Sequence, residues 1–232
     1  MLPLSDHNPR STVSVVNYLL VAANVLVFFW ELSLGPNIER DLMILSFVPA
    51  RFWAAPLYPP NLIRILISMF LHAGWLHLGG NMLYLWIFGD NVEDRLGHFK
   101  YVIFYLLCGL AATMSHAIAN PDSMLPSIGA SGAIAGVLGA YIVLFPKARV
   151  TTLIPIFVFI TIREIPAILV LGFWFVLQLF VGVASIGASA DTSGGVAVFA
   201  HIGGFVAGML LVVLMGGLRR PAYAPPPTDQ WY

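Results

Sequence analysis

Six stretches of this sequence, each 20 to 27 residues long, contain no Asp, Glu, Lys or Arg. A helix needs about 20 apolar residues to cross a bilayer, and a charge buried there costs several kcal/mol. Charged residues make up 9% of the chain, against roughly a quarter in soluble domains. The sequence therefore predicts a membrane protein with six transmembrane helices, at about 13–32, 66–89, 101–119, 130–146, 165–187 and 196–217.

The same stretches predict an all-α fold, a six-helix bundle. Backbone polar groups in hydrocarbon must be satisfied internally, and a barrel would need alternating instead of continuous apolar residues. A seventh uncharged stretch, residues 150–162, is too short to cross, so we expect an interfacial or re-entrant segment there. Residues 1–218 are expected to form one membrane domain, followed by a Pro-rich tail at 219–232.

The distribution of Lys and Arg predicts the orientation. Eight of these residues fall on the side that holds both termini, and three fall on the other side. Both termini and the tail are therefore expected in the cytoplasm. The connection from about Glu31 to Arg64 is then outside, and its apolar composition predicts that it lies in the membrane interface. By analogy, the compact form without a transit peptide favours a prokaryotic plasma membrane.

Composition also excludes several function classes. Eleven basic residues balance eleven acidic ones, so no nucleic-acid partner is expected. The single cysteine, Cys108, cannot form an intrachain disulfide and has no second thiol for a metal cage. The expected partners are the lipid bilayer and membrane proteins, with no cofactor.

Polar residues at membrane depth must be paired or line a wet cavity, and five of them lie on the predicted helices. His72, His77 and Asn81 lie early in the second helix, Ser131 near the start of the fourth, and His201 near the start of the sixth. These three helices run from outside to inside, so the five residues can meet at one depth. His77 and Asn81 are four apart and share a helix face, whereas His72 points elsewhere.

Small residues continue the faces that carry Ser131 and His201. They are Ala135, Gly139, Gly204 and Gly208. Small residues let membrane helices approach closely, so this packing would bring the Ser131 hydroxyl within reach of a His201 nitrogen. A serine hydroxyl becomes a good nucleophile when a neighbouring imidazole removes its proton. The pair is therefore predicted to be a nucleophile and its base.

The surroundings of Ser131 suit the oxyanion that such an attack creates. Ser131 is predicted to start a helix, where backbone N–H groups favour negative charge, and Gly129 and Gly132 allow another backbone to come close. His77 and Asn81 can donate to the oxyanion, an interaction worth about 3 to 4 kcal/mol per donor.

The nearest acids, Asp122 and Asp191, belong to outer loops upstream of the fourth and sixth helices. A Ser–His dyad is therefore favoured over a triad.

Three motifs together resemble the rhomboid family of intramembrane serine proteases. They are H-x-x-x-x-H-x-x-x-N from His72 to Asn81, G-A-S-G from Gly129 to Gly132, and A-H-x-G-G from Ala200 to Gly204, in that order. The resemblance covers the six-helix core. It implies that Ser131 is the nucleophile, His201 the general base, and His77, Asn81 and the Ser131 N–H the oxyanion donors.

The resemblance also implies that Arg64 belongs to an outer-loop element that supports the site, together with Gly129, Gly132 and His72. The fifth helix would border the path by which a substrate helix enters. Many members have an aromatic residue four positions after the serine, stacked on the histidine, and a Trp before the loop arginine. This chain has Ala135 and Ile63 there, so His201 must be oriented by other packing.

The function that follows is cleavage of transmembrane or juxtamembrane segments of membrane proteins near the outer face. One alternative is a non-catalytic rhomboid-like protein that binds substrate helices. A transporter is disfavoured because intramembrane acids and inverted repeats are lacking in the sequence. A zinc site on the three histidines is disfavoured because an H-E-x-x-H glutamate is lacking. Glu31, His98 and His116 are interpreted as helix-end or interface groups without chemistry.

Overall fold

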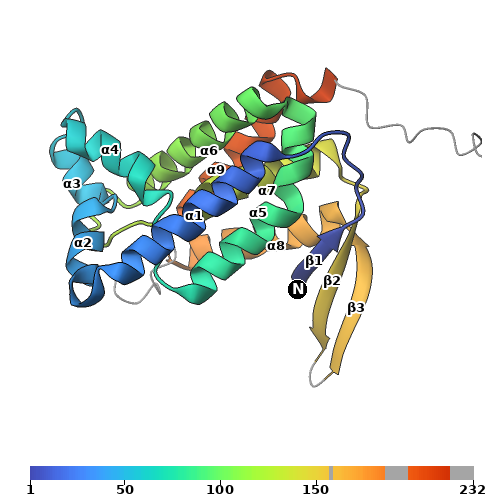
Figure 1. Ribbon diagram of the computed structural model, residues 1–232, viewed down its shortest axis with the longest axis horizontal. Coiled ribbons are helices and arrows are strands. Elements are labelled where there is room, and N and C mark those ends of the chain that lie inside the picture. The colour runs from blue at the N-terminus through green and yellow to red at the C-terminus, as the bar shows by residue number, and fades with distance from the viewer. Residues whose placement is uncertain (157–158, 186–197, 220–232) are drawn as a thin grey trace, which may run out of the picture.

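A bundle of apolar helices forms the body of the molecule in the computed structural model, which describes residues 1–156, 159–185 and 198–219. Figure 1 shows the helices packed side by side. Within these residues the helices of 14 residues or more are α1 (Val15–Ser33), α5 (Trp75–Leu96), α6 (His98–Ala119), α7 (Ser131–Leu144), α8 (Ala167–Ser185) and α9 (Val198–Leu214). Three of them, α1, α6 and α8, are long and apolar enough to cross a membrane, whereas α7 and α9 are apolar but shorter. The molecule is a mostly helical membrane protein.

The helices α7 and α9 are in backbone contact. A Cβ added to Gly208 would overlap the carbonyl oxygen of Gly136, and one added to Gly204 would overlap that of Gly132. The close approach predicted between the fourth and sixth helices is thus present, and these small residues permit it. Because α7 starts at Ser131 and α9 carries His201 in its first turn, this contact fixes the distance between the two side chains.

The predicted second helix, 66–89, has the wrong boundaries. The short helix α4 (Pro59–Ser68) ends before it, and α5 starts at Trp75 and continues to Leu96. Charged side chains near the end of α5 have partners on the N-terminal segment. For this reason the helix continues past Gly89, where the uncharged stretch ends. Glu93 accepts hydrogen bonds from the first N–H groups of α1, and Asp94 accepts them from Ser11 and Thr12.

The connection between α1 and α5 folds into short helices at one end of the bundle (Figure 1). They are η1 (Gly35–Asn37), α2 (Ile38–Leu45), α3 (Pro49–Ala54) and α4. Trp53 donates to the carbonyl oxygen of Ala117 at the end of α6, and Phe47 and Phe52 pack nearby. Arg64 donates to the Ile44 carbonyl oxygen and to Asn61 Oδ1, each at 2.8 Å. Arg64 therefore joins α4 to α2.

A three-stranded antiparallel sheet lies at the opposite end of the bundle (Figure 1), so the all-helical expectation is wrong. Its order is β1 (Leu2–Asp6), β2 (Arg149–Ile156) and β3 (Phe159–Pro166). Within the stretch 150–162, for which an interfacial or re-entrant segment was expected, residues 150–156 and 159–162 therefore lie on the antiparallel strands β2 and β3. Strand partners satisfy its backbone, its β-branched residues favour strands, and Val150 and Thr152 are buried. Tyr141 donates to Asp6 Oδ2 at 2.6 Å and ties β1 to α7.

The chain ends, in the described part, with η3 (Gly217–Arg219). The predicted tail from 220 onward, Asp191 and the first residues of the predicted sixth helix lie outside the described residues.

Candidate active site

Ser131 is the first residue of α7, and the turn before it requires glycine. Gly129 has φ +123°, a conformation that side chains disfavour, and a Cβ there would lie 2.7 Å from Cε1 of His77. Its N–H donates to the Ser68 carbonyl oxygen at 2.8 Å. At Gly132 a Cβ would lie 2.6 Å from that of Ala112 on α6. The two glycines thus let His77 and α6 approach the start of α7.

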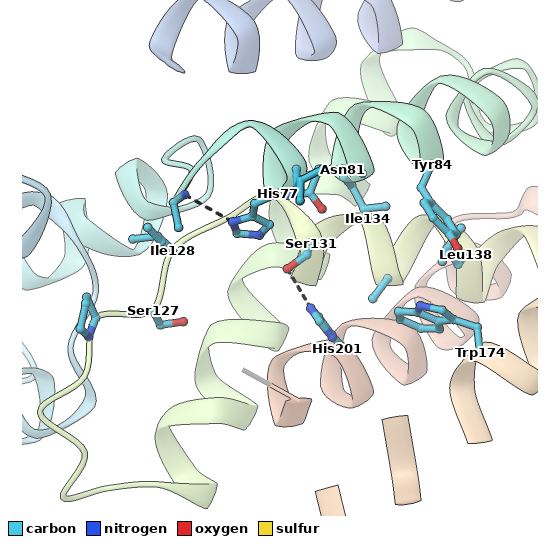
Figure 2. A pocket seen from close by; sticks show the side chains of 15 residues that line it. His77, Asn81, Tyr84, Ser127, Ile128, Ser131, Ile134, Leu138, Trp174 and His201 are labelled. Carbon is cyan, nitrogen blue, oxygen red and sulfur yellow. Dashed lines mark hydrogen bonds between the residues drawn. The ribbon is translucent and has the colours of Figure 1, made fainter. Parts of the chain in front are cut away.

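His201 contacts Ser131 through one ring nitrogen. Its Nε2 lies 2.8 Å from Ser131 Oγ, as the dashed line in Figure 2 marks. Its other nitrogen, Nδ1, lies 3.0 Å from Oε1 of Gln178 on α8. Trp174, also on α8, lies beside the imidazole, with 5.8 Å between ring centroids. The pair expected from sequence is in contact, and α8 supplies two further neighbours.

Sequence reasoning missed Gln178 and Trp174. Their signal was present, because Gln178 is an amide within the uncharged stretch 165–190 and Trp174 lies one helical turn before it. An amide at membrane depth needs a partner. The packing that orients His201 in place of an aromatic residue at Ala135 comes from α8 instead of α7.

His77 and Asn81 lie on the same face of α5, above Ser131 in Figure 2. The Ala73 N–H donates to His77 Nδ1 at 3.4 Å, so Nε2 carries the ring proton of the neutral imidazole. That Nε2 faces the turn at Gly129. Asn81 Nδ2 lies 3.0 Å from His72 Nε2, and its amide has a second N–H for another acceptor.

His72 precedes α5 instead of lying on it, because the helix starts at Trp75. It is buried, its Nδ1 lies 3.2 Å from the Phe70 carbonyl oxygen, and its backbone N–H donates to Glu31. Glu31 lies in the last turn of α1, in line with its interpretation as a helix-end group, and its side chain is fully buried. A hydrogen-bonded chain thus runs from Glu31 through His72 to Asn81.

A cavity of about 560 Å³ opens beside the Ser131 hydroxyl. It is lined by Ala73, Leu76, His77, Gly80, Asn81, Tyr84, Pro126, Ser127, Ile128, Ser131, Ile134, Ala135, Leu138, Trp174 and His201. Figure 2 shows Ile134, Leu138 and Trp174 to one side of Ser131 and His201, and Ile128 to the other side. The arrangement can hold an apolar side chain while a polar group next to it contacts Ser131.

Among the described residues, no group of three or more His, Cys, Asp or Glu side chains could hold a metal ion. The imidazole rings of His72 and His201 use both nitrogens in the contacts above.

Comparison with known proteins identifies relatives. The Rhomboid domain family model matches residues 59–218. Rhomboid protein 1, mitochondrial, of Saccharomyces cerevisiae is 33% identical over 138 residues, which cover 57% of this chain and 37% of the relative. Rhomboid protease GluP of Bacillus subtilis is 28% identical over an alignment of 239 positions, gaps included, which covers 96% of this chain and 40% of the relative. The human Presenilin-associated rhomboid-like protein, mitochondrial, is 29% identical over 154 residues, which cover 65% of this chain and 38% of the relative. The chain thus spans less than half the length of these relatives.

Proposed function

Because this chain belongs to the rhomboid family and one of its relatives is named as a rhomboid protease, we propose that it is an intramembrane serine endopeptidase. Ser131 and His201 would act as a catalytic dyad. The observation that carries this proposal is the 2.8 Å contact between Ser131 Oγ and His201 Nε2 beside the cavity. A hydroxyl in hydrogen-bond contact with an imidazole is the arrangement that activates a serine.

The reaction follows from the positions of these groups. His201 Nε2 takes the proton of the Ser131 hydroxyl as Oγ attacks the scissile carbonyl carbon, and later gives it to the leaving amine. The oxyanion accepts hydrogen bonds from His77 Nε2–H, the second N–H of Asn81 and the Ser131 N–H at the start of α7. Water then hydrolyses the acyl-enzyme, with His201 as base.

The substrates proposed are transmembrane or juxtamembrane segments of other membrane proteins, cut near the outer face. A peptide bond inside a helix is shielded by the helix's own hydrogen bonds, so the segment must unwind locally. Gly, Pro or Ser in its outer third would favour this, and the family resemblance implies a small residue before the scissile bond. We retain the plasma membrane as the proposed location, although two of the three relatives are named as mitochondrial.

The test is labelling of the purified protein with a fluorophosphonate, which reacts with activated serines. Wild type is expected to be labelled, Ser131→Ala not at all, and His201→Ala at least about a hundredfold more slowly, in the range that general-base catalysis contributes. Ser33→Ala is the matched control, because Ser33 is an exposed serine at the end of α1. Labelling of Ser131→Ala at the wild-type rate would refute the nucleophile. A folded but unlabelled wild type would favour the non-catalytic alternative.

A further inference from the structure

The helix α8 contacts the imidazole of His201 at the nitrogen that faces away from Ser131. Gln178 Oε1 lies 3.0 Å from Nδ1, while Ser131 Oγ lies 2.8 Å from Nε2. Trp174 and Gln178 are four residues apart, so they lie on one face of α8. Trp174 packs on the His201 ring and also on Phe205, one turn further along α9. The ring is therefore held from α8 by a hydrogen bond and by an aromatic contact.

We propose that Gln178 is a positioning residue for the general base, and that its side-chain oxygen selects the tautomer of His201 in which Nε2 is free to accept the serine proton. This inference rests on the proposed protease function. A neutral imidazole has one N–H and one bare nitrogen. Because the amide oxygen can only accept, Nδ1 carries the proton and Nε2 presents its lone pair to the Ser131 hydroxyl.

The proton balance agrees with this role. When the Ser131 proton passes to Nε2, the imidazole becomes a cation with an N–H at both nitrogens, and Nδ1–H keeps its bond to Gln178. A bond from a charged donor is stronger than one from a neutral donor, so the contact stabilises the imidazolium as it forms. The proton on Nε2 then leaves with the amine, and Nδ1–H is unchanged throughout. Gln178 exchanges no proton.

Ala135 explains why this support must come from α8. Its side chain is a single methyl group on α7, and it lines the cavity on the Ser131 side. It cannot cover the imidazole, whereas Trp174 does so from the opposite helix. Two residues of α8 thus fix the plane and the tautomer of a base that belongs to α9.

The experiment measures the rate of fluorophosphonate labelling across pH for wild type, Gln178→Leu, Gln178→Glu and the control Leu177→Ala. Leucine has a similar size but no acceptor, so labelling is expected to fall at least about tenfold, part of the 10²- to 10⁴-fold that a general base contributes. Glutamate keeps the acceptor and adds a negative charge. Labelling is then expected to persist, and the midpoint of its pH profile to move about one unit or more to higher pH, because a carboxylate favours the imidazolium. Leu177 is about half exposed, and its variant is expected to match wild type.

The outcomes separate this inference from the proposed function. A wild type that is folded but not labelled contradicts the protease proposal itself. A labelled wild type with Gln178→Leu equally fast at every pH overturns the role of Gln178 alone. A slow Gln178→Leu combined with an unshifted profile for Gln178→Glu also overturns it, because a purely structural contribution would slow labelling without moving the midpoint. Thermal unfolding in detergent verifies that each variant is folded.

Discussion

At the scale of single residues, Glu31 shows how a distant side chain supports the site. Its carboxylate oxygens lie 3.1 and 3.3 Å from the backbone nitrogen of His72, which donates to them. His72 in turn contacts Asn81, one of the three proposed oxyanion donors. Glu31 and His72 are both almost completely buried, so water cannot replace a lost partner. The segment before α5 is therefore held in place from α1.

The hydrogen bonds that link Glu31, His72 and Asn81 predict different effects for two substitutions at Glu31. Glu31→Gln keeps an acceptor for the His72 N–H and is expected to leave stability nearly unchanged. Glu31→Leu leaves that buried N–H without a partner and is expected to cost about 1 to 3 kcal/mol. Thermal unfolding in detergent measures both, and Glu39→Leu, at an exposed acid of α2, is the control. Equal stability of Glu31→Leu and wild type would contradict this role.

At the scale of elements, the glycines of α7 and α9 determine how closely the two helices approach. Gly208→Ala would push a methyl group into the Gly136 carbonyl, which belongs to rigid backbone. We expect a loss of about 3 kcal/mol, the upper range for overpacking, and slower labelling because Ser131 and His201 move apart. Gly172 on α8 has open space around it, so Gly172→Ala is the matched control and is expected to be neutral or slightly stabilising. A stable, fully labelled Gly208→Ala would contradict this account.

Long apolar helices could be predicted from the uncharged stretches, whereas elements that depend on tertiary contacts could not. The predictions 13–32 and 130–146 lie within two residues of α1 and α7. The end of α5 was missed because Glu93 and Asp94 have partners more than 75 positions earlier in the chain. The short length of the stretch 150–162 excluded a membrane crossing but did not predict a hairpin. The pairing of this hairpin with β1 joins residues far apart in the sequence, so local sequence does not predict it.

The residues of the candidate site likewise include some that the sequence predicted and some that depend on tertiary contacts. Motifs identified Ser131, His201, His77 and Asn81, and the small residues of two helices predicted that Ser131 and His201 would meet. Gln178 was not predicted, because an amide side chain does not by itself indicate a role until its partner is known. Its contact with His201 depends on how α8 packs on α9, and the sequence of neither helix contains that information.

At the scale of the whole molecule, the bundle has two distinct ends. The helices α2, α3 and α4 cover one end, and the sheet lies at the other (Figure 1). Ser131 starts α7 on the side of the short helices, and the strands follow after α7 ends. Lys147, Arg149 and Arg163 are at the sheet end, and from the excess of basic residues on this side we propose that it lies in the cytoplasm. The proposed site would then face outward.

Cysteine labelling tests this orientation. The native Cys108 is fully buried in α6, so wild type is expected to be unreactive towards a membrane-impermeant maleimide. Asp122→Cys lies in the exposed turn before α7, and Glu164→Cys lies on β3 at the sheet end; both native side chains are exposed. In intact cells we expect Asp122→Cys to react at once and Glu164→Cys to react only after the membrane is permeabilised, because one crossing by α7 separates them. Reaction of both from the same side would contradict that crossing, and the reversed pattern would place the Ser131 cavity on the cytoplasmic side.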